Sequence, residues 1–154
     1  MRNATFEERK TTPCNSLALR QAARHVSQIY ERHLAAEGLR ASQYSILSTL
    51  GRCGPQPIGA LAKRMVMDRT TLGRALRPLE RDGLLEIGQG PDGRTRSLHL
   101  TAIGETKLAA ASVRWQEAQT EFEEAFGTQE AADLRATLRR VITVTGEGGA
   151  EQGA

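Results

Sequence analysis

The chain has 154 residues, a formal net charge of +3 and 39% hydrophobic residues, a composition typical of a soluble globular domain. No apolar run is long enough to span a membrane, and residues 1–15 lack the apolar segment of a secretory signal. Its two cysteines, Cys14 and Cys53, lie far apart, which argues against a disulfide framework and favours a reducing, cytoplasmic compartment.

Helices are predicted for the first third of the chain. Residues 1–13 are polar and are expected to form a flexible tail. A helix is predicted over 16–37, where Gly38 ends an apolar stripe at three- and four-residue spacing. The stripe comprises Leu19, Ala22, Ala23, Val26, Ile29, Tyr30, His33 and Leu34. A second helix is predicted from near residue 42 to the loop GRCGPQP at 51–57, and its inward side chains are Tyr44, Ile46, Leu47 and Leu50.

Two further helices follow in close succession. One is predicted over 58–66 with Pro57 as its first residue, a position that tolerates proline. The next is predicted over 69–82, with Asp68 as N-cap and Gly83 at its end. Its inward residues are Leu72, Ala75 or Leu76, and Leu79. The tight connection between these helices has the spacing of a helix-turn-helix, whose second helix enters the major groove of DNA.

This second helix is strongly basic. Between Lys63 and Arg81 there are six basic residues and two acidic ones, a net +4, so the rest of the chain sums to −1. Arginine and threonine together on one short helix suit phosphate oxygens and base edges, although a solvated amphipathic helix has the same charge pattern. Pro78 is expected to kink the helix without breaking it.

A β-hairpin is predicted next. Two β-prone runs at 84–87 and 94–100 flank the turn sequence GQGPDG. A hairpin directly after a recognition helix is the wing of a winged helix. Its tip carries Arg94, and an arginine on a narrow hairpin can enter a minor groove.

The last third of the chain is predicted to form two helices. Thr101 is expected to cap a long helix that runs to Phe126. Its apolar seam for another helix is Ala111, Trp115, Ala118, Phe122 and Ala125. The region from 105 to 130 carries a net charge of −4, so this helix is expected to point away from nucleic acid. Thr128 is expected to cap a final helix that buries Leu134, Leu138, Val141 and Ile142.

Residues 146–154 are expected to form a disordered tail, since they are rich in glycine and polar side chains. The apolar seams of the outer helices predict a partner subunit. Two recognition helices would then lie about 34 Å apart, one turn of DNA, on a roughly palindromic site.

The order of these elements resembles the MarR family of winged helix-turn-helix transcriptional regulators. The resemblance covers about 16–145, and its most specific segments are GLRASQYSILSTL, IGALAKRMVMDRTTLGRALRPLERDGLL and PDGRTRSLHLTAIG. It implies a mainly α fold with a small β-hairpin wing, in one domain over 14–145. Within it, a winged helix at about 38–104 is flanked by dimerisation helices at about 16–37 and 102–145.

The resemblance also implies a function. Members are usually homodimers that bind DNA sequence-specifically, and they typically repress nearby genes. They release a roughly palindromic operator when a small aromatic ligand binds or a cysteine is oxidised. The implied DNA-facing residues of the recognition helix are Arg69, Thr70, Thr71 and Arg74. Arg94 matches the wing-tip arginine and Asp92 a carboxylate that holds the wing in shape, while Arg77 either contacts DNA or pairs with Glu80 or Asp82.

The candidates for sensing or effector binding are Cys14, Tyr30, His33, Tyr44 and Trp115. Cys14 lies at the start of the first helix, where the helix dipole favours a reactive thiolate. It comes about two residues earlier than the cysteine of the family's hydroperoxide sensors and lacks the expected aromatic neighbours, so an ordinary or pocket-lining cysteine is favoured. The four other residues either line a cavity between the DNA-binding lobe and the dimer helices or simply pack.

Enzymatic activity, a cofactor and a metal site are not expected. The histidines lack metal-ligand spacing with either cysteine, and no nucleophile–base pair, phosphate-binding glycine loop or Cys-x-x-Cys motif is present. The alternatives are a redox-sensing repressor using Cys14, a DNA-binding protein without an effector, and a thiol-dependent enzyme. Double-stranded DNA, a second copy of the chain and a small-molecule effector are the expected partners, with no membrane.

Overall fold

The computed structural model describes residues 14–146, so the expected tail at 1–13, and that at 146–154 apart from Gly146, lie outside the described residues. The described chain is mostly helical with one small antiparallel sheet, as expected. Its elements are α1 (Asn15–Leu34), η1 (Ala35–Glu37), α2 (Ala41–Cys53), β1 (Gln56–Pro57), α3 (Ile58–Met65), α4 (Arg69–Arg81), β2 (Leu85–Gln89), β3 (Arg96–Leu100), α5 (Ala102–Phe126) and α6 (Thr128–Gly146).

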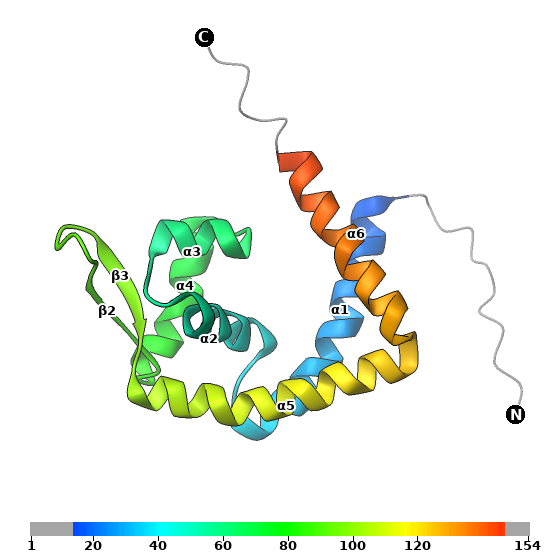
Figure 1. Cartoon of the computed structure of the whole chain (residues 1–154), viewed down its shortest axis with the longest axis horizontal. Coiled ribbons are helices and arrows are strands. Elements are labelled where there is room, and N and C mark those ends of the chain that lie inside the picture. The colour runs from blue at the N-terminus through cyan, green and yellow to red at the C-terminus, as the bar shows by residue number, and fades with distance from the viewer. Residues whose placement is uncertain (1–13, 147–154) are drawn as a thin grey trace, which may run out of the picture.

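The elements form a compact lobe and an extended helical region. The lobe comprises α2, α3, α4 and the sheet, and α5 runs along its base toward α1 and α6 at the other end of the molecule (Figure 1). The lobe is built around leucines that are at most 1% exposed, namely Leu47, Leu61, Leu72, Leu79, Leu85 and Leu98. Burial of these side chains provides the main driving force for closing the lobe.

The first two helices largely follow the prediction. α1 passes into a 3₁₀ turn, η1, and Gly38 ends it with a left-handed φ of 68°. α2 buries its four expected side chains but continues three residues into the predicted loop, to Cys53. Gly51 belongs to this last turn, where a Cβ atom would lie 2.6 Å from Leu108 Cδ2 of α5. This glycine therefore permits close helix packing and does not mark a turn.

The sequence did not predict one of the three strands, β1. Pro57 is not the first residue of α3: it has ψ 146°, caps the helix, and forms β1 with Gln56. β1 pairs with β3 at the edge of a sheet of order β1-β3-β2. A proline is tolerated in an edge strand, and a two-residue strand is too short to have an alternating pattern.

The helix-turn-helix forms as predicted, with small changes at the boundaries. α3 ends at Met65, one residue early, and Val66 takes a left-handed conformation with φ 53°. The Met67 N–H then donates to the Ala62 carbonyl at 2.9 Å and closes the turn. α4 continues through Pro78 as one helix, and its buried residues are Leu72, Leu76 and Leu79.

The hairpin and the start of α5 are confirmed. β2 and β3 pair from Leu85↔Leu100 to Gln89↔Arg96, so the wing tip lies between these strands. Thr101 caps α5 and accepts from the Gly104 N–H at 3.0 Å. Gly104 is fully packed against the Leu84 carbonyl, which leaves no room for a side chain.

The end of α5 and the whole of α6 depart from the prediction. Ala111 and Ala118 are completely buried, but Ala125 of the expected seam is exposed because no described element covers that side of the last turn. Thr128 is the first residue of α6 and not its N-cap. Gly127 precedes the helix instead, and its carbonyl accepts from the Ala131 N–H at 2.9 Å.

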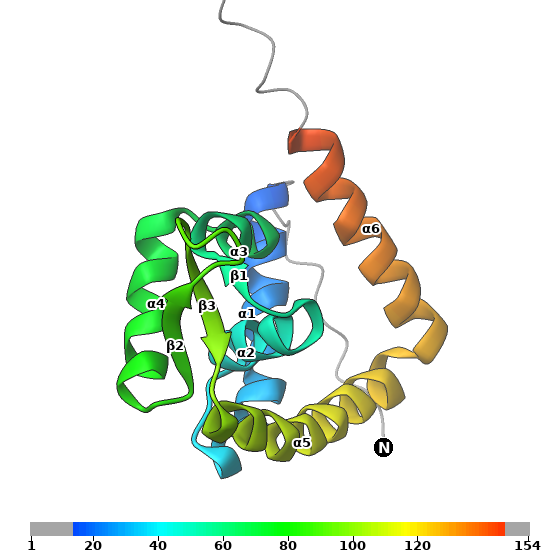
Figure 2. The same ribbon diagram turned by 60° about the vertical axis from the view of Figure 1, so that its left-hand side comes forward.

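The expected burial along α6 is wrong for the single chain. Leu134 is only partly buried, while Leu138, Val141 and Ile142 are 38%, 40% and 52% exposed. α6 rises from the end of α5 and stands apart from the lobe in both views (Figures 1 and 2). Within residues 14–146, no second layer covers the apolar side of this helix.

Candidate nucleic-acid interface

The recognition helix carries several exposed arginines beside its buried leucines. Arg69, Arg74 and Arg77 are exposed, and Thr70 is exposed beside them. Among residues 14–146, none of these three arginines forms an ion pair. Within this range Arg77 pairs with neither Glu80 nor Asp82, and Asp82 instead lies 3.2 Å from Arg81. The guanidinium groups are thus free to bind an anionic partner.

The start of the helix is fixed by its cap. Asp68 Oδ1 accepts from the Thr71 N–H at 2.8 Å, and Asp68 Oδ2 accepts from the Thr71 hydroxyl at 2.6 Å. The hydroxyl bond, followed by the backbone bond, holds the pKa of Asp68 below its usual value. The hydroxyl hydrogen of Thr71 is therefore committed to the cap, which fixes the first turn of the helix that carries Arg69 and Thr70.

The wing tip is organised by a second carboxylate. Asp92 accepts from the backbone N–H groups of Arg94 and Thr95 at 3.0 and 2.9 Å, and from the Thr95 hydroxyl. These bonds, led by the hydroxyl, lower the pKa of Asp92 to about 2. Asp92 thus has the structural role that the family resemblance implied, and it holds Arg94 exposed at the tip.

One further cation lies beside this surface. Arg96, the first residue of β3, is exposed and faces Gln89 across the hairpin. From the sequence, it was placed only within the β-prone run at 94–100. Its proximity to Arg94 in the chain was the signal that would have identified it.

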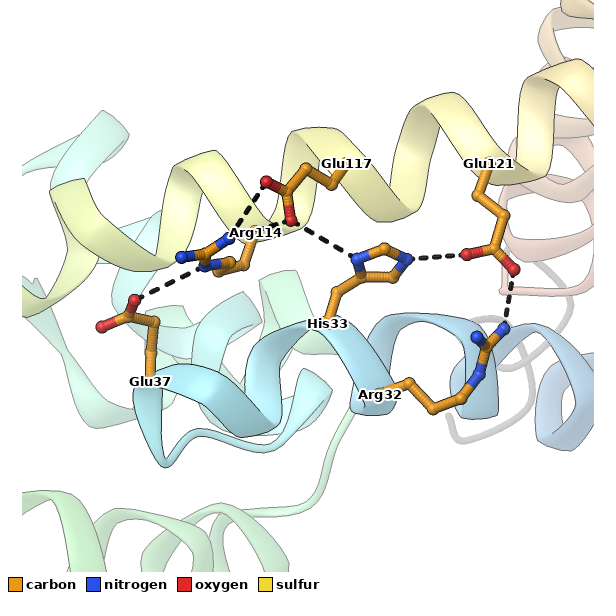
Figure 3. A network of polar contacts seen from close by, with 6 residues as sticks. All are labelled: Arg32, His33, Glu37, Arg114, Glu117 and Glu121. Atoms are coloured by element: carbon orange, nitrogen blue, oxygen red, sulfur yellow. Dashed lines mark hydrogen bonds and ion pairs between the residues drawn. The ribbon is translucent and has the colours of Figure 1, made fainter.

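The acidic charge of α5 serves partly to hold α1 in place. His33 lies between two carboxylates of α5, with Nε2 2.7 Å from Glu121 and Nδ1 3.5 Å from Glu117 (Figure 3). Arg32 extends this row at one end, 2.6 Å from Glu121, and Arg114 at the other. Hydrogen bonds from His33 and then Arg32 lower the pKa of Glu121. The network joins the two helices along one side.

The remaining effector candidates lie in separate settings. Tyr44 is buried and stacks on Trp115, with ring centroids 6.0 Å apart. The Tyr30 hydroxyl donates to Gln119, and burial raises the pKa of Tyr30. Tyr30 also lines a cleft of about 1170 Å³ between α1, α5 and α6, but His33, Tyr44 and Trp115 do not. The four residues therefore do not line this cleft together.

The two cysteines are both free and exposed. Cys14 is the N-cap of α1, and its Sγ accepts from the Leu17 N–H at 3.4 Å. Cys53 ends α2.

In the described part of the chain, no cluster of histidine, cysteine and carboxylate side chains could hold a metal ion, and no helix is long and apolar enough to cross a membrane.

The fold and the basic surface together define a winged helix-turn-helix protein. A model of the MarR family matches residues 39–94, which span most of the lobe. The chain is 32% identical to the Mycobacterium tuberculosis transcriptional regulator MosR, whose structure is known in complex with DNA; the match covers 83% of this chain and 98% of that one, with a TM-score of 0.68. The chain belongs to the MarR family of transcriptional regulators.

Two further similarities extend this result. The uncharacterized HTH-type transcriptional regulator YwoH of Bacillus subtilis (strain 168) is 28% identical over 96 residues, which cover 62% of this chain and 70% of YwoH. BpsR of Bordetella bronchiseptica, whose DNA binding is regulated by 6-hydroxynicotinic acid, has a TM-score of 0.75 and 18% identity, covering 92% of this chain and 99% of BpsR. At that identity the likeness concerns the fold alone.

Proposed function

We propose that this protein is a homodimeric repressor that binds a roughly palindromic operator. The observation that carries the proposal is that Arg69, Arg74 and Arg77 of α4 are exposed and have no carboxylate partner among residues 14–146. The DNA complex of the related regulator MosR supports it. The proposed DNA contacts are Arg69, Thr70, Thr71, Arg74, Arg77 and Arg94.

α4 and the wing have different roles in this proposal. α4 enters the major groove, where Arg74 contacts base edges and the neighbouring side chains contact edges or phosphates. Arg94 enters the adjoining minor groove, which is narrow and strongly negative in A·T-rich sequence. Asp68 and Asp92 hold these side chains in place without contacting DNA.

Dimerisation is proposed through the outer helices, at about 16–37 and 102–145, with the winged helix at about 38–104. Apolar side chains remain exposed on α1 and α6, including Leu19 at 42% and Ile142 at 52%. A second copy covering both helices would remove this surface from water. Its recognition helix would lie about 34 Å away, in the next turn of the major groove.

A small aromatic ligand is proposed to release the repressor from DNA. The regulation of BpsR by 6-hydroxynicotinic acid makes small aromatic acids the first compounds to screen. Tyr30, His33, Tyr44 and Trp115 remain the candidate contacts: Tyr30 lines the cleft between α1, α5 and α6, and the other three lie at the contacts of α1 and α2 with α5.

The second candidate is a redox-sensing repressor that uses Cys14. The observation in its favour is that the Cys14 thiol is exposed at the start of α1. Treating the DNA complex with peroxide should then release the natural protein but not Cys14→Ser. If both proteins dissociate, or neither does, Cys14 is not the sensor.

The test of DNA binding starts by selecting bound DNA from a random pool. On the selected operator, Arg74→Ala should relax base preference and Arg94→Ala should lower affinity mainly for A·T-rich flanks, each by about 1–3 kcal/mol. The logarithm of affinity should fall with that of salt concentration, with a slope near −0.9 per phosphate neutralised. A flat salt dependence, or unchanged affinity in both variants, would contradict the proposal.

A further inference from the structure

We infer that Gly59 is a positioning residue for Arg69, because its missing side chain leaves the space in which the Arg69 guanidinium lies. Gly59 belongs to the first turn of α3, while Arg69 is the first residue of α4. The inference rests on the proposed function, since it takes Arg69 to be a DNA contact, and it adds a residue of α3 to the machinery that aims it.

The contact involves most of the guanidinium group. A Cβ atom at residue 59 would lie 2.5 Å from Arg69 Nη2, 3.2 Å from Cζ and 3.3 Å from Nε. Three atoms of the planar group thus lie within 3.3 Å of this point, so the group occupies the space beside Gly59 with more than its terminal nitrogen. Any other amino acid at this position would displace Arg69 from its place.

The backbone offers no other reason for a glycine here. Gly59 is helical and is not among the described glycines with positive φ. Glycine is one of the poorest helix formers, so an alanine would favour α3. Gly73 of α4 makes the comparison clear, since nothing lies within 4 Å of the position its Cβ would take.

Arg69 depends on this contact for its orientation. No hydrogen bond or ion pair of its side chain is found within the described chain, and the residue is exposed. A long arginine side chain loses much rotamer freedom when it binds a partner. Packing across Gly59 restricts that freedom before DNA arrives, which favours binding in one geometry.

The test combines the variants Gly59→Ala and Arg69→Ala with their double variant. Arg69→Ala should weaken operator binding about 5- to 100-fold, the range for one lost DNA contact. Gly59→Ala should weaken it by a smaller factor, about 3- to 10-fold, because the contact is misdirected and not removed. In the Arg69→Ala background, Gly59→Ala should have no further effect, since Gly59 acts only through Arg69.

A measurement on the free protein separates positioning from a general structural role. The Nε–H signal of Arg69 in NMR relaxation should show restricted motion that Gly59→Ala abolishes. Arg74 is the matched control in the same helix, and its Nε–H signal should not change. Thermal unfolding should show that Gly59→Ala keeps the fold, because the displaced atoms are the far end of a flexible side chain.

Results that contradict the inference can be told apart from results that contradict the proposed function. If Gly59→Ala weakens binding equally with and without Arg69, DNA itself approaches the glycine and the inference is wrong. The inference also fails, while the proposed function stands, if Arg69→Ala binds normally but Arg74→Ala and Arg94→Ala do not. If none of these variants changes affinity, the proposed function fails as well.

Discussion

Val66 holds a backbone conformation that its side chain disfavours. It is the one non-glycine residue with positive φ among residues 14–146. A β-branched side chain is especially strained there, and because Val66 is 66% exposed, burial returns little stability. The strain is maintained by the turn between α3 and α4, where the Val66 and Met67 N–H groups donate to Lys63 and Ala62.

Val66→Gly should therefore stabilise the protein. Relief of the left-handed strain is worth about 1–2 kcal/mol, and the greater freedom of glycine in the unfolded chain offsets part of it. Chemical denaturation would measure the gain in unfolding free energy. The reverse change, Gly83→Ala, places a Cβ at φ 73° with nothing within 4 Å of it, and should lose a similar amount. An unchanged Val66→Gly protein would show that the strain is small.

Asp92→Asn should disorder the wing without unfolding the lobe. The amide keeps one acceptor oxygen for the Arg94 and Thr95 N–H groups, but it loses the negative charge that strengthens these bonds and the second oxygen that accepts from the Thr95 hydroxyl. The two N–H groups should therefore exchange faster, and operator affinity should fall about 3- to 10-fold. Asp133→Asn on α6 changes the net charge equally and is the control. Equal losses in the two variants would attribute the effect to charge alone.

The lowered pKa of Asp92 predicts that the order of the wing depends on pH. The pKa of Asp92 is lowered from 3.8 to about 2 in the folded protein, so its contribution to wing order is complete above about pH 4. That contribution is lost as the pH falls through about 2. An NMR titration of the Asp92 carboxyl carbon would check the value, and a midpoint near 3.8 would contradict it.

At the scale of elements, periodic patterns were predictable and short or intermolecular features were not. The apolar spacing of α2 and α4 gave both their existence and their buried faces, and Asp68 and Thr101 gave the starts of α4 and α5. β1 was not predicted because a strand of two residues has no alternating pattern, and because its proline suggested the start of a helix. α6 was predicted to be helical correctly, but its apolar stripe did not reveal that Leu138 and Ile142 stay exposed in one chain.

The residues of the candidate site were predictable from the sequence, but the contacts that position them were not. Charge counting and the family resemblance identified the arginines of α4 and the wing. They could not reveal that the Thr71 hydroxyl is used by the cap, or that Arg69 lies across a glycine ten residues earlier in the chain. Both features depend on where a side chain turns after it leaves the helix, which residue spacing does not determine.

The network between α1 and α5 should make the pairing of these helices sensitive to Glu121. Glu121→Gln removes the charge that binds both His33 and Arg32 (Figure 3). Amide hydrogens in the last turns of α1 should then exchange about two- to five-fold faster, as expected for partly exposed ion pairs. Glu124→Gln, an exposed neighbour on α5 outside the network, should leave the exchange unchanged. Equal rates in all three proteins would mean that apolar packing alone holds the helices.

At the scale of the whole molecule, the single chain leaves an apolar surface that a second copy is proposed to cover. Ile142→Asp places a charge on this surface and should convert the protein to monomers at micromolar concentration, as measured by light scattering. Operator affinity should fall with it, because only one recognition helix remains per particle. Ile103→Asp is the control, since Ile103 is 64% exposed but lies at the other end of α5. A dimeric Ile142→Asp protein would contradict this interface.

The length of α5 sets how sensitively such a dimer would respond to a change at its outer helices. Its 25 residues form a rod of about 37 Å whose two ends lie in different parts of the molecule. By simple leverage, pivoting this rod by about 5° moves its far end by about 3 Å, close to the 3.4 Å rise of one base pair along a DNA strand. A ligand would therefore need to tilt α5 only slightly to put the two reading helices out of step with consecutive grooves.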